Sequence, residues 1–147
     1  MKRSPALLGL SREHHEALLL ARRASSADPR SAAARGQRTH LLTRWAEQFE
    51  PHFALEEEVL LPALAAAGQA GPAAEALAQH TGLRHLMERL REGDLPALPA
   101  WGDAMLAHVH FEERALFPLA ERSLDLTALA GSLNRTTFPP IPHVQRP

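Results

Sequence analysis

Two short stretches of the chain repeat the same reactive residue types at the same spacing. The first, HFALEEEVLLP, begins at His52, and the second, HVHFEERALFP, begins at His108. In each, a glutamate follows the histidine by four residues, a second glutamate comes next, and a proline ends the stretch. Residues four apart lie one turn apart on the same face of an α-helix. Each stretch therefore points an imidazole and a carboxylate the same way, as the donors of a metal site would be arranged.

Histidine also interrupts two further amphipathic segments. Apolar residues recur at three- and four-residue steps around His14, His52, His80 and His108. A buried imidazole or carboxylate is costly unless it is paired or bound. Each of these histidines lies near the middle of its segment, so in an up-and-down bundle all of them would meet at one height. Because carboxylates can bridge two cations and imidazole suits iron, zinc, copper or nickel, the pattern predicts a dinuclear metal site in the core.

The segments that must position these residues are helical by composition. Alanine and leucine dominate, and β-branched residues are sparse. Stretches rich in helix breakers divide the chain at 25–31, 68–72 and 93–99. We expect main helices over 5–25, 31–66, 73–91 and 99–122, with Ser4 and Pro5 at the first start, and a short helix over 125–133.

These elements predict an all-α fold, an antiparallel up-down four-helix bundle with a short C-terminal helix and a Pro-rich tail. We expect the bundle over 1–135 and the tail over 136–147. The internal repeat extends back to Trp45 and Trp101, each seven residues before its histidine. It indicates that the second and fourth helices are related by an approximate twofold axis, and it predicts both tryptophans as core anchors.

Prolines are expected to disturb the second and fourth helices. Pro62 and Pro118 each remove one backbone hydrogen bond, which predicts that the helix kinks or ends there. Pro51 directly precedes His52. The second helix is therefore expected either to bend at this point or to consist of two pieces.

Composition and charge exclude several classes of site and partner. The chain has no cysteine, which excludes disulfides, zinc–thiolate sites and iron–sulfur clusters. A formal net charge of −1 gives no reason to expect nucleic acid as a partner. The N-terminal apolar residues are too few and too interrupted by charge for a signal peptide, and no stretch reaches the roughly 18 apolar residues of a membrane span. We therefore expect a cytoplasmic protein with no membrane partner.

Several motifs together resemble the hemerythrin-like, HHE cation-binding family. They are LSREHHEAL, HFALEEEVLLP, QHTGLRHLMERL and HVHFEERALFP, in this order, and the resemblance covers about residues 7–122. It implies a four-helix bundle that holds two iron ions, oxo- or hydroxo-bridged, and binds dioxygen or responds to redox change and nitric oxide. Matched residue by residue, it implies a ligand set of His14, His52, Glu56, His80, His108 and Glu112.

The third helix departs from the pattern of the oxygen-carrying members. They have a second histidine four residues after the first, whereas here Arg84 stands four residues after His80. Two six-coordinate metals offer about twelve positions, and the implied ligands with one bridging oxygen leave about two open. Open positions would admit small ligands on either metal. Arg84 is a candidate for stabilising a bound anion at the cavity mouth.

The open positions would alternatively take an extra ligand from this chain. The candidates are Glu57, Glu113, His85 and His15. His15 is also the alternative to His14, since a small rotation of the first helix would exchange the two. Glu57 and Glu113 have two further interpretations, either as helix-surface charges or as acceptors for an imidazole N–H.

The sequence therefore predicts a di-iron protein that binds or senses dioxygen or a related small oxidant. No nucleophile–base pair, phosphate loop or organic-cofactor motif indicates substrate turnover. The alternatives are iron storage or detoxification, peroxide or nitric oxide scavenging, and a bundle that binds another divalent metal such as zinc or manganese. A purely structural bundle that docks partners is a further alternative, in which the histidines would not affect metal content.

Overall fold

The structure is a computed structural model that describes residues 2–134. Its helices are α1 (Pro5–Ser25), α2 (Ala32–Arg44), α3 (Glu50–Leu55), α4 (Leu61–Ala66), α5 (Ala70–Arg91), α6 (Ala97–Phe111), α7 (Phe117–Ser123) and α8 (Leu126–Leu133). Five-residue π-helical segments connect some of them: η1 (Trp45–Phe49), η2 (Glu56–Leu60) and η3 (Glu112–Leu116). Because these segments join their neighbours without a break, α2 to α4 form one rod over 32–66, and α6 to α7 form another over 97–123.

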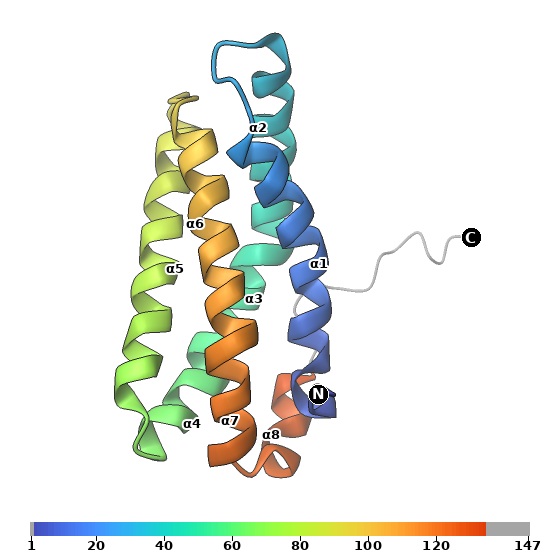
Figure 1. Cartoon of the computed structure of the whole chain (residues 1–147), viewed down its shortest axis with the longest axis vertical. Coiled ribbons are helices and arrows are strands. Elements are labelled where there is room, and N and C mark those ends of the chain that lie inside the picture. The colour runs from blue at the N-terminus through green and yellow to red at the C-terminus, as the bar shows by residue number, and fades with distance from the viewer. Residues whose placement is uncertain (1, 135–147) are drawn as a thin grey trace, which may run out of the picture.

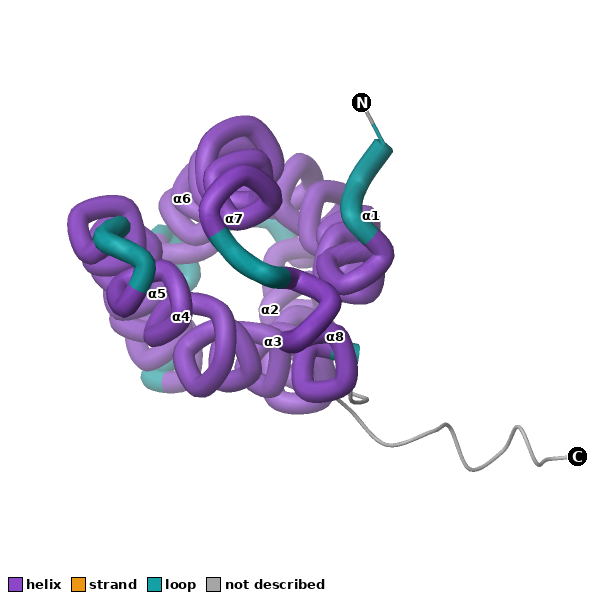
Figure 2. Tube along the Cα trace, turned by 90° about the horizontal axis from the view of Figure 1, so that it is seen from below, coloured by secondary structure: helices purple, strands orange, loops and turns teal. Residues whose placement is uncertain are grey.

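These two rods and the helices α1 and α5, which we also call rods, lie side by side along the long axis of the molecule, and the chain turns at both ends (Figure 1). α1 packs along α6, while α5 packs against both α6 and α4. Viewed along their length, the rods surround a shared interior (Figure 2). The short helix α8 packs against α1. The all-α prediction is confirmed for residues 2–134, in which no strand occurs.

The observed helix ends lie close to the predicted ones. α1 has the predicted bounds, and the hydroxyl of Ser4 accepts a hydrogen bond from the N–H of Ala6, as expected for a cap. α5 begins at Ala70, before the predicted start at 73. It can do so because Pro72 lies in the first turn of the helix. Backbone N–H groups in the first turn make no hydrogen bond within the helix, so the N–H that proline lacks is not needed there. The predicted Pro-rich tail lies outside the described residues.

Each π-helical segment ends two residues before a proline, namely Pro51, Pro62 or Pro118. The residue before the proline donates its N–H to the carbonyl five residues back, as Phe117 does to Glu112. In a regular α-helix the proline ring would collide with the carbonyl four residues back, and a wider turn avoids this. Both rods therefore continue past their prolines. The predicted alternatives of a helix end at Pro62 or Pro118 and of a split at Pro51 were wrong.

Two apolar clusters fill the interior, one toward each end of the rods. One contains Trp45 and Trp101, which are both buried, as predicted for core anchors. The other contains Leu64 and Phe117. On every rod most residues of one cluster precede a buried histidine and most residues of the other cluster follow it. The polar side chains thus form a layer between two apolar blocks.

Gly102 sets the spacing between α1 and α6. A Cβ atom at this position would lie 2.3 Å from the backbone nitrogen of Ser25 and 2.5 Å from the carbonyl oxygen of Ala21. Real Cβ atoms do not approach backbone this closely, so α6 can contact α1 here only without a side chain. The close contact holds one end of the bundle in a fixed arrangement.

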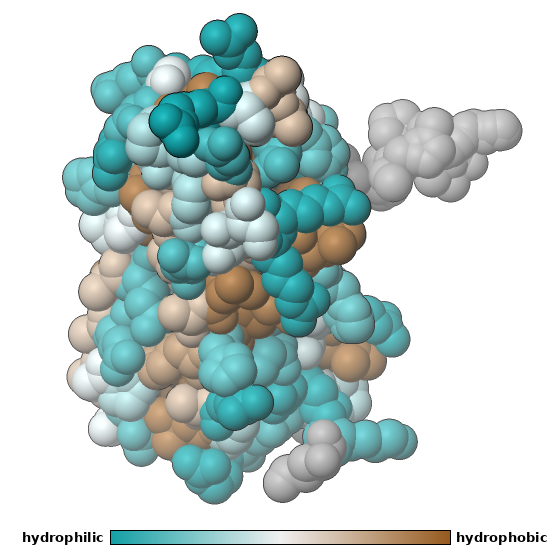
Figure 3. Space-filling model, turned by 45° about the horizontal axis from the view of Figure 1, so that its top comes forward, coloured by the Kyte–Doolittle hydropathy of each residue, from teal (hydrophilic) through white to brown (hydrophobic). Residues whose placement is uncertain are grey.

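The face of the molecule shown in Figure 3 is mostly hydrophilic, with smaller apolar areas between polar side chains. Among residues 2–134, the large apolar side chains that are exposed are those of Leu19 and Leu77. Within residues 2–134, no helix combines the length and apolar character that crossing a membrane would need.

Candidate metal centre

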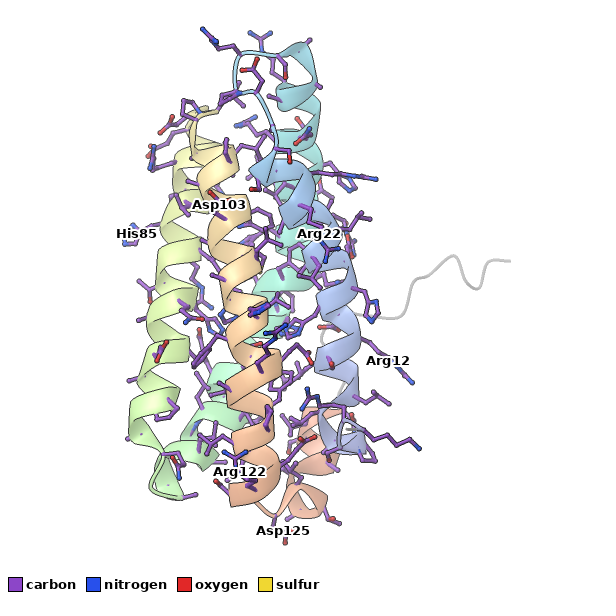
Figure 4. The ribbon with its side chains drawn as sticks, viewed as in Figure 1. Arg12, Arg22, His85, Asp103, Arg122 and Asp125 are labelled. Carbon is purple, nitrogen blue, oxygen red and sulfur yellow. The ribbon has the colours of Figure 1, made fainter. Side chains whose placement is uncertain are left out.

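Six polar side chains meet in the layer between the two apolar blocks. None of these residues exposes more than 4% of its surface, although each side chain can carry a charge. They are the six residues predicted as ligands, His14, His52, Glu56, His80, His108 and Glu112. In Figure 4 the sticks of this region fill the space between the ribbons, whereas the labelled Arg12 and His85 point outward. The structure therefore brings the whole predicted set together, while ligation itself stays a prediction.

The carboxylate of Glu112 is shared between two pairs of histidines. Its Oε1 lies 3.0 Å from Nε2 of His14 and 3.9 Å from Nε2 of His52. Its Oε2 lies 3.2 Å from Nε2 of His108 and 3.7 Å from Nε2 of His80. Each oxygen thus faces its own pair of imidazoles, as a carboxylate bridging two cations would.

Glu56 is shared between two single histidines. Its Oε2 lies 3.1 Å from Nε2 of His52, and its Oε1 lies 3.0 Å from Nε2 of His80. Two four-residue groups result, in each of which the potential ligand atoms lie within 4.8 Å of one another. We call the group that contains His14 and His52 position 1, and the group that contains His80 and His108 position 2. Both groups include Glu56 and Glu112.

Several atoms of this layer lack a hydrogen-bond partner. They are Nε2 of His80, Nε2 of His108, Oε1 of Glu56 and Oε2 of Glu112. A buried polar atom without a partner is costly, and such atoms are rare in native proteins. Here the donor and acceptor atoms come close to one another without suitable hydrogen-bond angles. Nitrogen and oxygen donors directed at a common space fit a metal cation better than they fit one another.

A ring of contacts holds the outer nitrogen of every imidazole. Nδ1 of His14 lies 2.6 Å from Glu113, and Nδ1 of His108 lies 2.7 Å from Gln79. The remaining contacts, both also 2.7 Å, join His80 to Glu57 and His52 to Glu13. Because these oxygens can only accept, each Nδ1 carries a proton and each Nε2 faces the centre. In every case the acceptor belongs to a rod other than that of the histidine.

Arginines hold two of these outer carboxylates. Arg84 contacts Glu57 at 2.7 Å and Glu50 at 2.7 Å, and its guanidinium lies 5.8 Å from the centre of a phenylalanine ring. At the other side of the centre, Arg3 lies 2.9 Å from Glu113. The guanidinium of Arg84 therefore binds carboxylates of its own chain. These contacts do not support the hypothesis that it receives an anion at a cavity mouth.

The electrostatics favour positive charge in this layer. Burial lowers the pKa of His80, but the facing carboxylates of Glu112 and Glu56 outweigh it and raise that pKa to about 10. The pKa of His14 and that of His52 are raised against burial by neighbouring carboxylates in the same way. Burial acts to raise the pKa of Glu112, but the surrounding imidazoles bring it well below its usual range. Protons thus supply, in the metal-free protein, the charge that cations would supply.

The candidates for additional ligands do not face the centre. His15 and His85 are exposed, so the exchange of His15 for His14 does not occur. Glu57 and Glu113 accept from imidazoles, which was one of the three interpretations predicted for them. Hydrogen bonding to His14 offsets burial and lowers the pKa of Glu113 to about 2.

Sequence reasoning missed two residues of the ring, Glu13 and Gln79. Each directly precedes a predicted ligand, His14 or His80, and each holds a histidine of another rod. Their positions carried a signal, because an acceptor next to a ligand is suited to reach a neighbouring imidazole. Which imidazole it reaches depends on helix packing.

The fold and the site define a helical bundle with a buried histidine–carboxylate metal site. A family model described as Hemerythrin HHE cation binding domain matches residues 9–120. The chain belongs to this family. The family and the buried groups together indicate a metal-binding protein, for which iron is the expected metal. Comparison with curated proteins and with solved structures gave no match.

Proposed function

We propose that the protein holds two iron ions and binds or senses dioxygen or a related small oxidant. The observation that carries this proposal is the sharing of both carboxylates, since each oxygen of Glu112 faces a different pair of histidines. Each oxygen of Glu56 likewise faces one histidine, His52 at position 1 and His80 at position 2. We further propose that the rods form an antiparallel up-down four-helix bundle and that the protein is cytoplasmic, with neither nucleic acid nor membrane as partner.

The six side chains would divide between the two positions. His14 and His52 would hold a metal at position 1, His80 and His108 would hold one at position 2, and the two glutamates would bridge them. The bridged set supplies about eight of the roughly twelve coordination positions of two octahedral ions. Iron supplies a reversible change of oxidation state and open positions for a small ligand.

Aromatic side chains close the centre against water. The ring of Phe53 stacks on His80 at a centroid distance of 3.9 Å, and that of Phe117 stacks on His14 at 5.6 Å. These rings fix the planes of the imidazoles and limit entry of water. Apolar walls suit an uncharged diatomic molecule, which has no charge that needs solvation by water.

Metal content and colour test the proposal. Protein purified without oxygen should contain two irons per chain and develop a charge-transfer absorption band on exposure to oxygen. His52→Ala and His108→Ala should each reduce the iron content. The matched controls His40→Ala and His110→Ala, which remove exposed histidines, should not. A colourless zinc protein, or iron content unaffected by His52→Ala and His108→Ala, would refute the proposal.

Scavenging of peroxide or nitric oxide is the second candidate function. The open coordination positions favour it, because a small oxidant would have direct access to the metal. A scavenger would consume either compound over many turnovers, whereas a binding or sensing protein would take up about one molecule per centre. Iron storage would instead load many ions per chain. Metal-to-protein ratio and stopped-flow consumption assays separate these outcomes.

A further inference from the structure

At each of the two metal positions, one histidine donates its Nδ1–H to an acceptor whose type differs between the positions. Glu13 directly precedes His14 and accepts from Nδ1 of His52, at 2.7 Å. Gln79 directly precedes His80 and accepts from Nδ1 of His108, also at 2.7 Å. The two acceptors thus occupy matching places, since each directly precedes one predicted ligand and accepts from another on a different helix. One is an anion and the other a neutral amide.

The remaining half of the ring is balanced. Glu113 holds His14 and contacts Arg3 at 2.9 Å. On the opposite side, Glu57 holds His80 and contacts Arg84 at 2.7 Å. Each position therefore has one histidine held by a glutamate that an arginine also contacts. The acceptors behind the two remaining histidines differ in charge, Glu13 at position 1 and Gln79 at position 2.

The orientation of the Gln79 amide is consistent with its role as an acceptor. Its nitrogen lies 3.4 Å from Glu75, which leaves its oxygen directed at His108. An amide oxygen fixes the ring of His108, but it does not add negative charge. A carboxylate that accepts from a ligating imidazole fixes the ring and also makes the imidazole a stronger donor to the metal.

We propose that the two positions bind metal unequally. Position 1 binds more tightly because the carboxylate of Glu13 accepts from Nδ1 of His52, and position 2 binds more weakly because the amide of Gln79 accepts from Nδ1 of His108. The inference rests on the proposed dinuclear site. Loss of a partner behind a ligating histidine typically lowers metal affinity 10- to 100-fold. We therefore expect two binding steps whose dissociation constants differ by roughly tenfold. Position 2 would lose its metal first to a chelator.

Titration of the metal-free full chain with Zn²⁺, in competition with a chromophoric chelator, measures both steps without oxygen chemistry. Glu13→Gln should weaken the tighter step and bring the two constants together. Gln79→Glu should strengthen the weaker step, which would also bring the two dissociation constants together. Glu58→Gln makes the same charge change at an exposed site and should leave both constants unchanged.

Each result has a distinct meaning. Binding of no Zn²⁺, or of one per chain, would refute the dinuclear site itself. Two equal steps in the wild type, or a ratio unaffected by both Glu13→Gln and Gln79→Glu, would overturn the inference and leave the dinuclear site intact. A tighter step abolished by His14→Ala but retained by His108→Ala would assign it to position 1, as proposed, and the reverse pattern would contradict that assignment. Circular dichroism of each variant checks that it is folded.

Discussion

Arg84 and His80 contact the same carboxylate oxygen. Oε2 of Glu57 lies 2.7 Å from Nη1 of Arg84 and 2.7 Å from Nδ1 of His80. The guanidinium thus acts on the proposed metal position through Glu57, without contact with a metal. It stands where the third helix of an oxygen-carrying hemerythrin would place a second histidine. Arg84 thus contacts, through Glu57, the histidine His80 that we propose as a ligand.

Replacing Arg84 by methionine should weaken metal binding more than it weakens the fold. Its ion pairs with Glu50 and Glu57 are partly exposed, so their loss should lower the free energy of unfolding by about 1 kcal/mol or less. Release of Glu57 should lower metal affinity by roughly tenfold. Urea denaturation and chelator competition measure the two effects. Arg89→Met, which removes an exposed ion pair with Asp94, should leave metal affinity unchanged, and an equal effect of both substitutions would contradict the prediction.

The stability of the metal-free protein should fall as pH rises above neutrality. Facing carboxylates outweigh burial and raise the pKa of His80 to about 10, so its contribution is complete below its ordinary value of 6.5 and is lost toward pH 10. The pKa of Glu113, about 2 against an ordinary 4.5, makes a contribution that is lost as pH falls below 4.5. Maximum stability is therefore expected between about pH 4.5 and 6.5.

Urea denaturation at several pH values, with a chelator present, measures this dependence. The metal-loaded protein is the comparison, because metals displace the imidazole protons and bind more tightly as pH rises. Its stability should increase over the range in which that of the metal-free protein decreases. A metal-free protein more stable at pH 8.5 than at pH 5.5 would contradict the assignment of these charges.

Gly102→Ala should destabilise the bundle by about 1–3 kcal/mol, since the added methyl group would meet the backbone of Ala21 and Ser25. Gly82→Ala is the matched control. It also lies within a helix, but nothing stands within 4 Å of its added Cβ. This substitution should stabilise the protein by roughly 0.5–1 kcal/mol. Thermal and urea denaturation give both values, and effects of the same sign would refute the proposed close contact.

Pro118→Ala should stabilise the metal-free protein and weaken metal binding. Alanine restores an N–H and removes the ring that opposes a regular α-turn, so the π-helical segment that begins at Glu112 can tighten. We expect the free energy of unfolding to rise by about 1 kcal/mol and metal affinity to fall by about tenfold, or 1.4 kcal/mol. Pro72→Ala, in the first turn of α5, should change neither. Unchanged affinity in Pro118→Ala would show that the wide turn is unimportant for the site.

The sequence predicted the helices and the six converging side chains because both follow from local rules. The four-residue spacing of His52 and Glu56 fixes their common face, and burial of His14 and His80 follows from the apolar residues around them. The contacts of Glu13 and Gln79 could not be predicted, because they depend on which rods are neighbours. The prolines were correctly seen as incompatible with a regular helix, but a wider turn of the backbone accommodates them without ending it.

The ring around the proposed centre links metal binding to assembly of the bundle. Glu113 of the 97–123 rod supports His14, and Gln79 of α5 supports His108 of that same rod. Each rod thus both receives an acceptor and provides one. Displacing any single rod would remove a ligand and also release the histidine that this rod supports. Bound metal should therefore make unfolding of the bundle more cooperative. Displacement of one rod and release of the metal would then occur together.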